Sequence, residues 1–240
     1  MPTGITEEDY VSVQSKLETI DIFARLTNHG VFVADLFRNN FLYVSDNPLV
    51  LLGCSKEEVL ARGYRHLIDN APDSEKQVMA ELVTASLNAH HNMKAEERQS
   101  HTISCNFHFM LDGRPVLVNH KISPLATDAR GIVWLALCVV SPSVHDDIGH
   151  ITATVEGKDG YSQYSLDEHC WIRNNRLAVL TSEERMMLYL SAQGCSMREI
   201  GERMFRSTDT VKMYRKHLFA KLGVSNITEA LNYAFNYNLL

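Results

Sequence analysis

The sequence predicts an α+β fold in two parts, an antiparallel sheet with helices followed by an all-α domain of four helices. Apolar runs of strand length, either alternating or unbroken, occur before residue 143 and are missing from residues 180–240. Residues 180–240 contain four helix start signals instead. Charge divides the chain in the same way. The net charge is −6, but residues 180–240 hold 8 Lys and Arg against 6 Asp and Glu.

Length and composition exclude several classes of protein. A chain of 240 residues that is 45% apolar can bury one large core or two ordinary ones. Its apolar runs are shorter than the ~18–20 residues that a membrane span needs, and the polar start "MPTGITEEDY" is unlike a signal peptide. Five cysteines without a CxxC pair indicate reduced thiols. We therefore expect a cytoplasmic protein without a membrane segment.

Residues 1–27 predict an N-terminal amphipathic helix. Its apolar residues gather toward the end, at Ile20, Ile22, Phe23 and Leu26. Such a helix suits packing against a second copy, so we expect a homodimer.

Residues 28–142 predict strands around a group of helices. The stretch "GVFVADLFRNNFLYVSD" indicates two strands joined by a turn at residues 38–40. Ser55 and Glu58 have the spacing of a capping box, which predicts a helix start. Asp73 or Ser74 is expected to open a longer helix. Its expected apolar positions are Val78, Leu82, Val83 and Leu87.

Three further strands are expected to complete this sheet. In "HTISCNFHFMLDGRPVLVNHKISPL", apolar and polar residues alternate up to a hairpin turn at Asp112-Gly113. The unbroken apolar run "IVWLALCVV", after Gly131, predicts a central strand that is buried on both faces.

Residues 143–179 are expected to be a linker with a β-hairpin around residues 158–160. Two interpretations stay open. This segment is either a covered connection or an element that orients the C-terminal domain.

The four C-terminal helices begin at recognisable N-caps. Thr181 with Glu184 and Ser196 with Glu199 have the spacing of capping boxes. Ser207 is expected to cap the third helix, which should end at Gly223, and Asn226 to cap the fourth.

Only "FRS" separates the second helix of this domain from the third, which predicts a helix-turn-helix motif. In such motifs the second helix of the pair lies in the major groove of DNA. Its exposed face should therefore be cationic, and Lys212, Arg215 and Lys216 satisfy this requirement beside Met213. Val211, Leu218 and Leu222 are expected to face inward.

Residues 180–240 resemble the LuxR-type (FixJ or GerE) DNA-binding domain. The matching residues are Leu180, Thr181, Glu184, Leu188, Gly194, Ser196, Glu199, Ile200, Ser207, Thr210, Val211, Lys212, Lys221, Leu222, Gly223, Val224, Glu229 and Ala230. The resemblance implies binding of double-stranded DNA. The residues it implies for this contact are Thr208, Thr210, Lys212, Met213, Arg215 and Lys216. Tyr214, Gly201 and Ile227 depart from the usual His, Ala and Arg of the family.

The element order of residues 28–142 resembles a PAS domain, which implies a small-molecule cavity. Candidate lining residues are Tyr43, Leu51, Tyr64, Phe107 and Trp134, although large aromatic residues at strand spacing are more often core. Tyr64 stands where light-sensing members carry a reactive cysteine, so flavin photochemistry is disfavoured. Haem is also disfavoured, because His90 and His91 lie at the end of the long helix and are interpreted as surface residues. The cofactor, if there is one, is unknown.

No catalytic or metal-binding pattern is found. Cys105 and His108 are three apart on an expected strand, so their side chains should lie on opposite faces, and the adjacent His90 and His91 diverge on a helix. The usual nucleophile, phosphate-loop and zinc-protease fingerprints are missing as well. We expect neither an enzyme nor a metal protein.

The sequence therefore predicts a PAS-like antiparallel sheet with helices, followed by a helix-turn-helix domain, in a transcriptional regulator of the LuxR family. The expected partners are double-stranded DNA, a second copy and a small-molecule ligand. One alternative is a receptor of the acyl-homoserine-lactone type, which has a similar length and the same C-terminal domain. Another is an interaction module that has lost DNA binding and dimerises through Tyr233, Phe235 and Tyr237.

Overall fold

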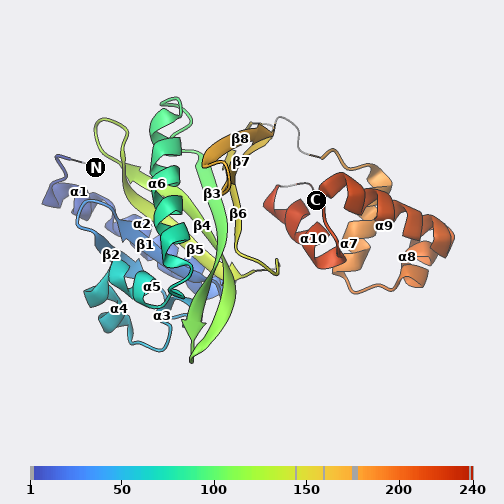
Figure 1. The fold of residues 1–240 in the computed structure, drawn as a ribbon, viewed down its shortest axis with the longest axis horizontal. Coiled ribbons are helices and arrows are strands. Elements are labelled where there is room, and N and C mark those ends of the chain that lie inside the picture. Colours follow the sequence, from blue (N-terminus) through green and yellow to red (C-terminus); the bar gives the residue numbers. More distant parts are fainter. Residues whose placement is uncertain (1–2, 144, 159, 175–177, 238, 240) are drawn as a thin grey trace. The chain divides into compact units, whose positions relative to one another are not determined.

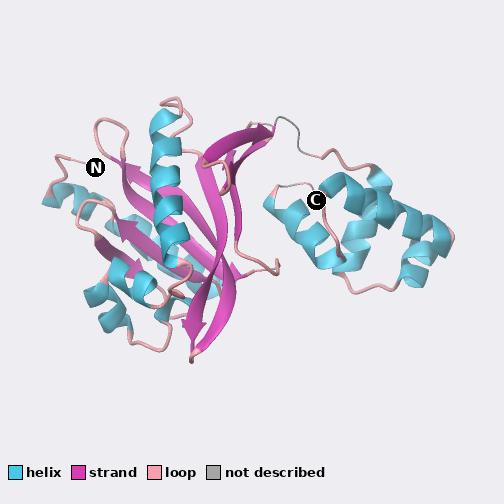
Figure 2. Cartoon of the chain, viewed as in Figure 1, coloured by secondary structure: helices cyan, strands magenta, loops and turns pink. Residues whose placement is uncertain are grey.

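The computed structural model describes residues 3–143, 145–158, 160–174, 178–237 and 239, and Figure 1 shows its ribbon. The chain forms two compact units, Met1–Asn174 and Asn175–Leu240. The first unit contains all the strands of the described residues and the second contains helices, as the colours of Figure 2 show. The expected α+β fold is confirmed, while the finer domain limits stay predictions.

The first unit is built on one antiparallel sheet in the order β2-β1-β5-β4-β3-β6-β7-β8. Its strands are β1 (Gly30–Asp35), β2 (Asn40–Val44), β3 (His101–Leu111), β4 (Arg114–Thr127), β5 (Val133–Pro142), β6 (Gly149–Val155), β7 (Tyr161–Ser165) and β8 (Cys170–Asn174). The apolar run in β5 lies between β1 and β4, in the interior of the sheet as expected. The hairpin between β3 and β4 turns at Asp112 and Gly113, which both have positive φ, as an Asp-Gly turn requires.

Helices cover both faces of this sheet. On one face lie α3 (Pro48–Leu51), α4 (Lys56–Arg62), α5 (Tyr64–Asp69) and α6 (Lys76–Asn92), and they share the first core cluster with β1 to β5. On the other face lie α1 (Glu7–Ser12) and α2 (Gln14–Thr27), which pack a second cluster against β1 and β5. The order from β1 through α6 to β5 is the PAS-like order that the sequence predicted.

The N-terminal segment differs from the expected single helix, because it is broken at Val13 between α1 and α2. Its buried face is formed by Val13, Leu17, Ile20 and Ala24. Ile22, Phe23 and Leu26, which gave the segment its apolar end, are exposed instead. One side of α2 therefore packs against the sheet, and a second apolar side is exposed to solvent.

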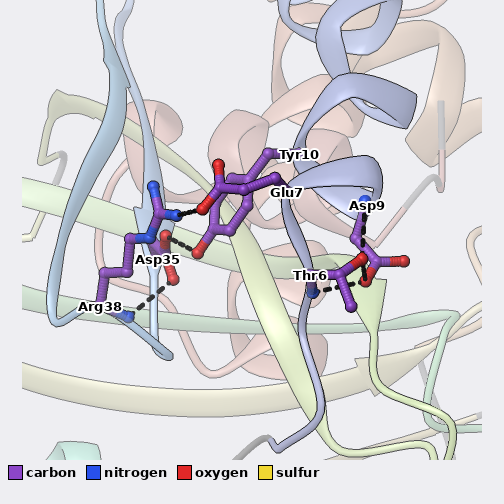
Figure 3. Close-up of polar contacts among 6 residues, drawn as sticks. All are labelled: Thr6, Glu7, Asp9, Tyr10, Asp35 and Arg38. Carbon is purple, nitrogen blue, oxygen red and sulfur yellow. Dashed lines mark hydrogen bonds and ion pairs between the residues drawn. The ribbon is translucent and has the colours of Figure 1, made fainter.

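A polar network fastens α1 to the end of β1 (Figure 3). The hydroxyl of Tyr10 donates to Oδ2 of the buried Asp35 at 2.7 Å, and the backbone N–H of Arg38 donates to Oδ1 of the same carboxylate. The Arg38 guanidinium lies 3.8 Å from the centre of the Tyr10 ring and pairs with Glu7. Burial, and next the hydrogen bond to Asp35, raise the pKa of Tyr10 to about 12, so the phenol remains a donor at neutral pH.

The long helix α6 begins later than expected, and only some of its expected apolar positions lie on its buried face. It starts at Lys76 after Glu75, and neither Asp73 nor Ser74 caps it. Leu82 is buried as expected, whereas Val83 and Leu87 are exposed. Ala85 and His90 are the other buried residues of α6. Apolar spacing alone did not distinguish these two sides.

Part of the segment expected as a linker, residues 143–179, belongs to the sheet instead. Strand β6 hydrogen-bonds to β3, and β7 and β8 continue the sheet outward. Strands β6 and β7 pair across the expected hairpin position, of which residue 159 lies outside the described residues. Because β3 would otherwise be an open sheet edge, its free backbone groups bind the next strand-forming segment of the chain.

Candidate DNA-binding surface

The second unit is a bundle of four helices around its own core. These are α7 (Ser182–Ala192), α8 (Met197–Met204), α9 (Thr208–Leu222) and α10 (Ile227–Asn236). The buried members of the core are Leu180, Met187, Leu188, Leu190, Ile200, Val211, Leu218, Leu222, Ala230 and Ala234.

All four predicted helix starts are confirmed. Thr181 and Ser196 form complete capping boxes with Glu184 and Glu199. The Ser207 hydroxyl accepts from the backbone N–H of Thr210, and the Asn226 side chain accepts from that of Glu229. These bonds satisfy backbone donors that have no partner inside a helix, which fixes where each helix begins.

The turn between α8 and α9 consists of three residues, as predicted. Phe205 adopts the left-handed conformation with φ 54°, and Ser207 then caps α9. Gly201 in α8 lies under this turn, where an added Cβ would come within 2.8 Å of the Arg206 carbonyl oxygen. The glycine that departs from the family pattern therefore allows the turn to approach α8 closely.

Helix α9 separates an apolar face from a cationic one. Val211, Leu218 and Leu222 are buried in the bundle, as predicted. Lys212, Met213, Arg215 and Lys216 are exposed, whereas Thr208 and Thr210 at the start of the helix are half-buried. Met213 exposes 47% of its surface although it is apolar. The structure thus places the six predicted DNA-contacting residues on α9, with the four of them that follow Val211 open to solvent.

The cations on this face are held only weakly by the protein. Lys212 pairs with Asp209 at 3.0 Å, and both side chains are largely exposed. The Arg215 guanidinium lies 5.2 Å from the centre of the Phe219 ring, and Lys216 has no hydrogen bond or ion pair within the described residues. Exposed ion pairs contribute about 0–1 kcal/mol, so a phosphate can replace them at little cost.

Lys221, also on α9, has a different role, which the sequence did not indicate. Its ammonium lies 2.5 Å from Glu184 on α7 and 3.3 Å from the Val179 carbonyl oxygen. Burial raises the pKa of Glu184, but hydrogen bonds from Lys221 and Thr181 outweigh it, so the pKa is below its usual value. The pair joins residues 37 apart, and no local pattern signals such a contact.

The ligand-pocket candidates of the first unit do not form one group. Phe107 is a buried member of the first core cluster, and Leu51 on α3 and Tyr64 on α5 pack against that cluster. Tyr43 and Trp134 belong to the cluster on the opposite face, beneath α1 and α2. The expectation that these five residues could line one cavity is wrong for Tyr43 and Trp134, because successive strand residues point to opposite faces.

His120, which no sequence pattern indicated, lies among the aromatic residues of the first cluster. Its ring centre is 5.5 Å from those of Phe32 and Phe107. Burial lowers the pKa of His120 to about 4, so the ring is neutral at pH 7. Its Nε2 atom and the buried Tyr64 hydroxyl have no hydrogen-bond partner among the described residues. Such groups are costly in an apolar core, which makes them candidates for contact with a polar ligand.

The interpretation of His90 as a surface residue is wrong. His90 is buried, its Nε2 lies 3.2 Å from the Gly131 carbonyl oxygen, and its ring packs against His101. The loop before β5 covers this end of α6, so helix position did not predict exposure. Among the described residues, no group of three or more His, Cys, Asp and Glu is placed to hold a metal ion. Nor does any helix in the described part of the chain have the length and apolar character for crossing a bilayer.

Sequence comparison assigns the second unit to a family. The family of bacterial regulatory proteins called luxR matches residues 178–234. The Fimbriae Z protein of Escherichia coli K12 is 29% identical over 77 residues, which are 32% of this chain and 37% of that protein. The transcriptional activator DevR/DosR of Mycobacterium tuberculosis is 39% identical over 62 residues, which are 26% of this chain and 29% of that protein. The chain therefore spans about a third of the length of these curated relatives.

Two matches to solved structures cover more of the chain. The Vibrio cholerae VqmA dimer without target DNA matches 93% of this chain and 88% of its own, with 18% identity and a TM-score of 0.37. The PAS domain of Bordetella pertussis BvgS matches 55% of this chain and 90% of its own, with 15% identity and a TM-score of 0.38.

Proposed function

We propose that this chain, which carries a luxR-family helix-turn-helix domain at residues 178–234, is a DNA-binding transcriptional regulator controlled by its PAS-like unit. The observation that carries the proposal is the cationic, solvent-exposed side of α9, opposite a fully buried apolar side. A helix of 15 residues with such a side fits the major groove, which is about 12 Å wide.

Each residue of this surface has a role in the proposal. Lys212, Arg215 and Lys216 contact phosphates or guanine edges, and Met213 contacts base edges. Thr208 and Thr210 lie at the N-terminus of α9, where backbone N–H groups favour a phosphate. The Thr210 hydroxyl is 2.8 Å from Ser207 Oγ, which orients it at that end of the helix.

Selection of bound genomic fragments by the purified full-length chain tests this function. We expect specific fragments to be enriched by the wild type and lost with the double variant Lys212→Ala, Lys216→Ala. The double variant Arg62→Ala, Lys94→Ala removes the same charge from exposed positions of the first unit and should select the same fragments as the wild type. Equal enrichment by both double variants would contradict the proposed surface. No enrichment by the wild type would favour an interaction module.

The regulator is proposed to act as a homodimer in the cytoplasm. A single α9 offers few phosphate contacts, so two copies on half-sites about 34–36 Å apart would supply the affinity for a specific site. The exposed apolar side of α2, formed by Ile22, Phe23 and Leu26, supports a contact between two first units.

The first unit is proposed to bind a small ligand beneath α3 to α6. Support comes from the unpartnered Tyr64 hydroxyl and His120 Nε2, which lie among Phe32, Phe41 and Phe107. A small molecule with polar atoms could satisfy both groups while its apolar part contacts the rings. Thermal-shift screening against small metabolites tests this site. A ligand that stabilises the wild type, but stabilises Tyr64→Phe and His120→Phe less, would support it, and equal stabilisation of all three would contradict it.

A further inference from the structure

The surface of the first unit has a hollow of about 500 Å³ between α6 and the last two strands of the sheet. The lining residues on α6 are Gln77, Ala80, Glu81, Thr84, Ala85 and Asn88, which recur every three or four positions and so form one side of the helix. The opposite wall is formed by Tyr164, His169 and Trp171. Figure 1 shows β7 and β8 beside α6, and β8 ends at Asn174, the last residue of the unit.

Glu81 lies in this hollow with one oxygen held in place. Its Oε1 atom accepts from the Tyr164 hydroxyl at 2.8 Å and lies 2.6 Å from His169 Nδ1. The Trp171 indole donates to the Ala85 carbonyl oxygen at 3.2 Å, and its ring meets that of Tyr164 edge-on at 5.3 Å. The wall thus presents two oriented aromatic rings beside a fixed carboxylate.

The hollow holds a charged carboxylate at neutral pH. Hydrogen bonds from His169 and then Tyr164 hold the pKa of Glu81 below its usual value, so the carboxylate is charged. No lysine or arginine is among the described residues that line the hollow. Residues 1–179, which include the whole unit, hold 15 Lys and Arg against 23 Asp and Glu, so the surrounding field also attracts cations.

We propose that this hollow binds a small organic cation, with a primary ammonium group on the Glu81 carboxylate and an apolar chain against Trp171 and Tyr164. A cation close to an indole or phenol ring is attracted by the ring as well as by the carboxylate. The side-chain amides of Gln77 and Asn88, at the two ends of the α6 side, offer hydrogen bonds to a second polar group. The site is independent of the core ligand proposed above and of DNA binding.

Calorimetric titration of the full-length chain with 1,5-diaminopentane at low ionic strength tests the site, with tryptophan fluorescence as a second signal. We expect saturable binding that is weakened at least tenfold by Glu81→Gln. Glu57→Gln removes the same charge from the exposed surface of α4 and should bind as the wild type does. The neutral analogue 1,5-pentanediol should not bind.

A second variant covers the case in which Glu81→Gln disturbs the packing of β7 and β8. Thr84→Arg places a cation in the hollow from an exposed helix position and leaves the bonds of Glu81 in place. It should also abolish diaminopentane binding. The proposal is overturned if the wild type shows no saturable binding, or if Glu81→Gln and Thr84→Arg both bind the diamine as tightly as the wild type.

Discussion

The ammonium of Lys221 lies 2.5 Å from a carboxylate oxygen of Glu184, and this ion pair joins α9 to α7. Glu184 is only 5% exposed and also completes the capping box of Thr181. One carboxylate therefore fixes both the start of α7 and the position of the helix that is proposed to enter DNA.

The stability of the second unit should therefore depend on pH through Glu184. Its pKa is lower in the folded chain than in the unfolded chain, so the pair stabilises the fold above the usual glutamate pKa of about 4.3 and this contribution is lost as pH falls below it. We expect Glu184→Gln to be less stable than the wild type by about 1–3 kcal/mol at pH 7. Calorimetric unfolding from pH 7 to pH 3 should show this difference shrinking. A difference that stays constant with pH would contradict a charged pair.

Lys216 should contribute one phosphate contact. Lys216→Ala is expected to weaken binding to many DNA sequences and to reduce the slope of log K against log salt by about 0.9. Titrations of a selected fragment at several salt concentrations measure this slope. Lys94→Ala, in the first unit, should leave the slope unchanged. An unaltered slope in Lys216→Ala would show that this ammonium does not contact a phosphate.

Met213 should favour thymine within the operator. An exposed thioether side chain among three cations can contact the C5 methyl group of thymine, which uracil lacks. Replacing thymine by uracil at the contacted position should cost about 0.8 kcal/mol for the wild type, the usual value for one buried methyl-sized group. The same replacement should cost Met213→Ala nothing. A penalty that is equal in both proteins would assign the methyl contact to another residue.

The exposed apolar side of α2 should control association of the chain. Leu26 is 77% exposed and Ile22 is 53% exposed, so a glutamate at position 26 should be tolerated in the monomer but destabilise a dimer. Sedimentation should show Leu26→Glu shifted toward monomer relative to the wild type. Val83→Glu changes a residue that is 60% exposed on α6 and is the matched control. If both variants sediment as the wild type does, α2 is not the interface.

Much of the second unit followed from local sequence. A capping box joins residues three apart. Thr181 with Glu184 and Ser196 with Glu199 therefore indicate helix starts without any information about distant parts of the chain. The inward side of α9 followed from the spacing of Val211, Leu218 and Leu222. Lys212, Met213, Arg215 and Lys216 could be named because the same spacing leaves the opposite side to solvent, whereas Thr208 and Thr210 came from the resemblance to the LuxR-type domain.

Sequence was less informative where a segment has two apolar sides. Both α2 and α6 bury one side and expose another, and apolar spacing did not show that Val83 and Leu87 lie on the exposed side of α6. Local spacing gives the angle between two side chains on a helix, but the direction in which the helix faces depends on the sheet beneath it. His90 was misplaced for a related reason, because the covering loop at Gly131 is 41 residues away.

The sequence by itself determined the order of the strands and helices from β1 to β5, the four helix starts of the second unit and the cationic side of α9, because each depends on residues within a few positions of one another. Only the tertiary structure decided that Lys221 pairs with Glu184, that Tyr43 and Trp134 lie across the sheet from Tyr64, and that β7 and β8 enclose a hollow with α6. These features join residues far apart in the chain. Their contacts depend on strand register and helix packing, which are set by burial across the whole unit and not by neighbouring residues.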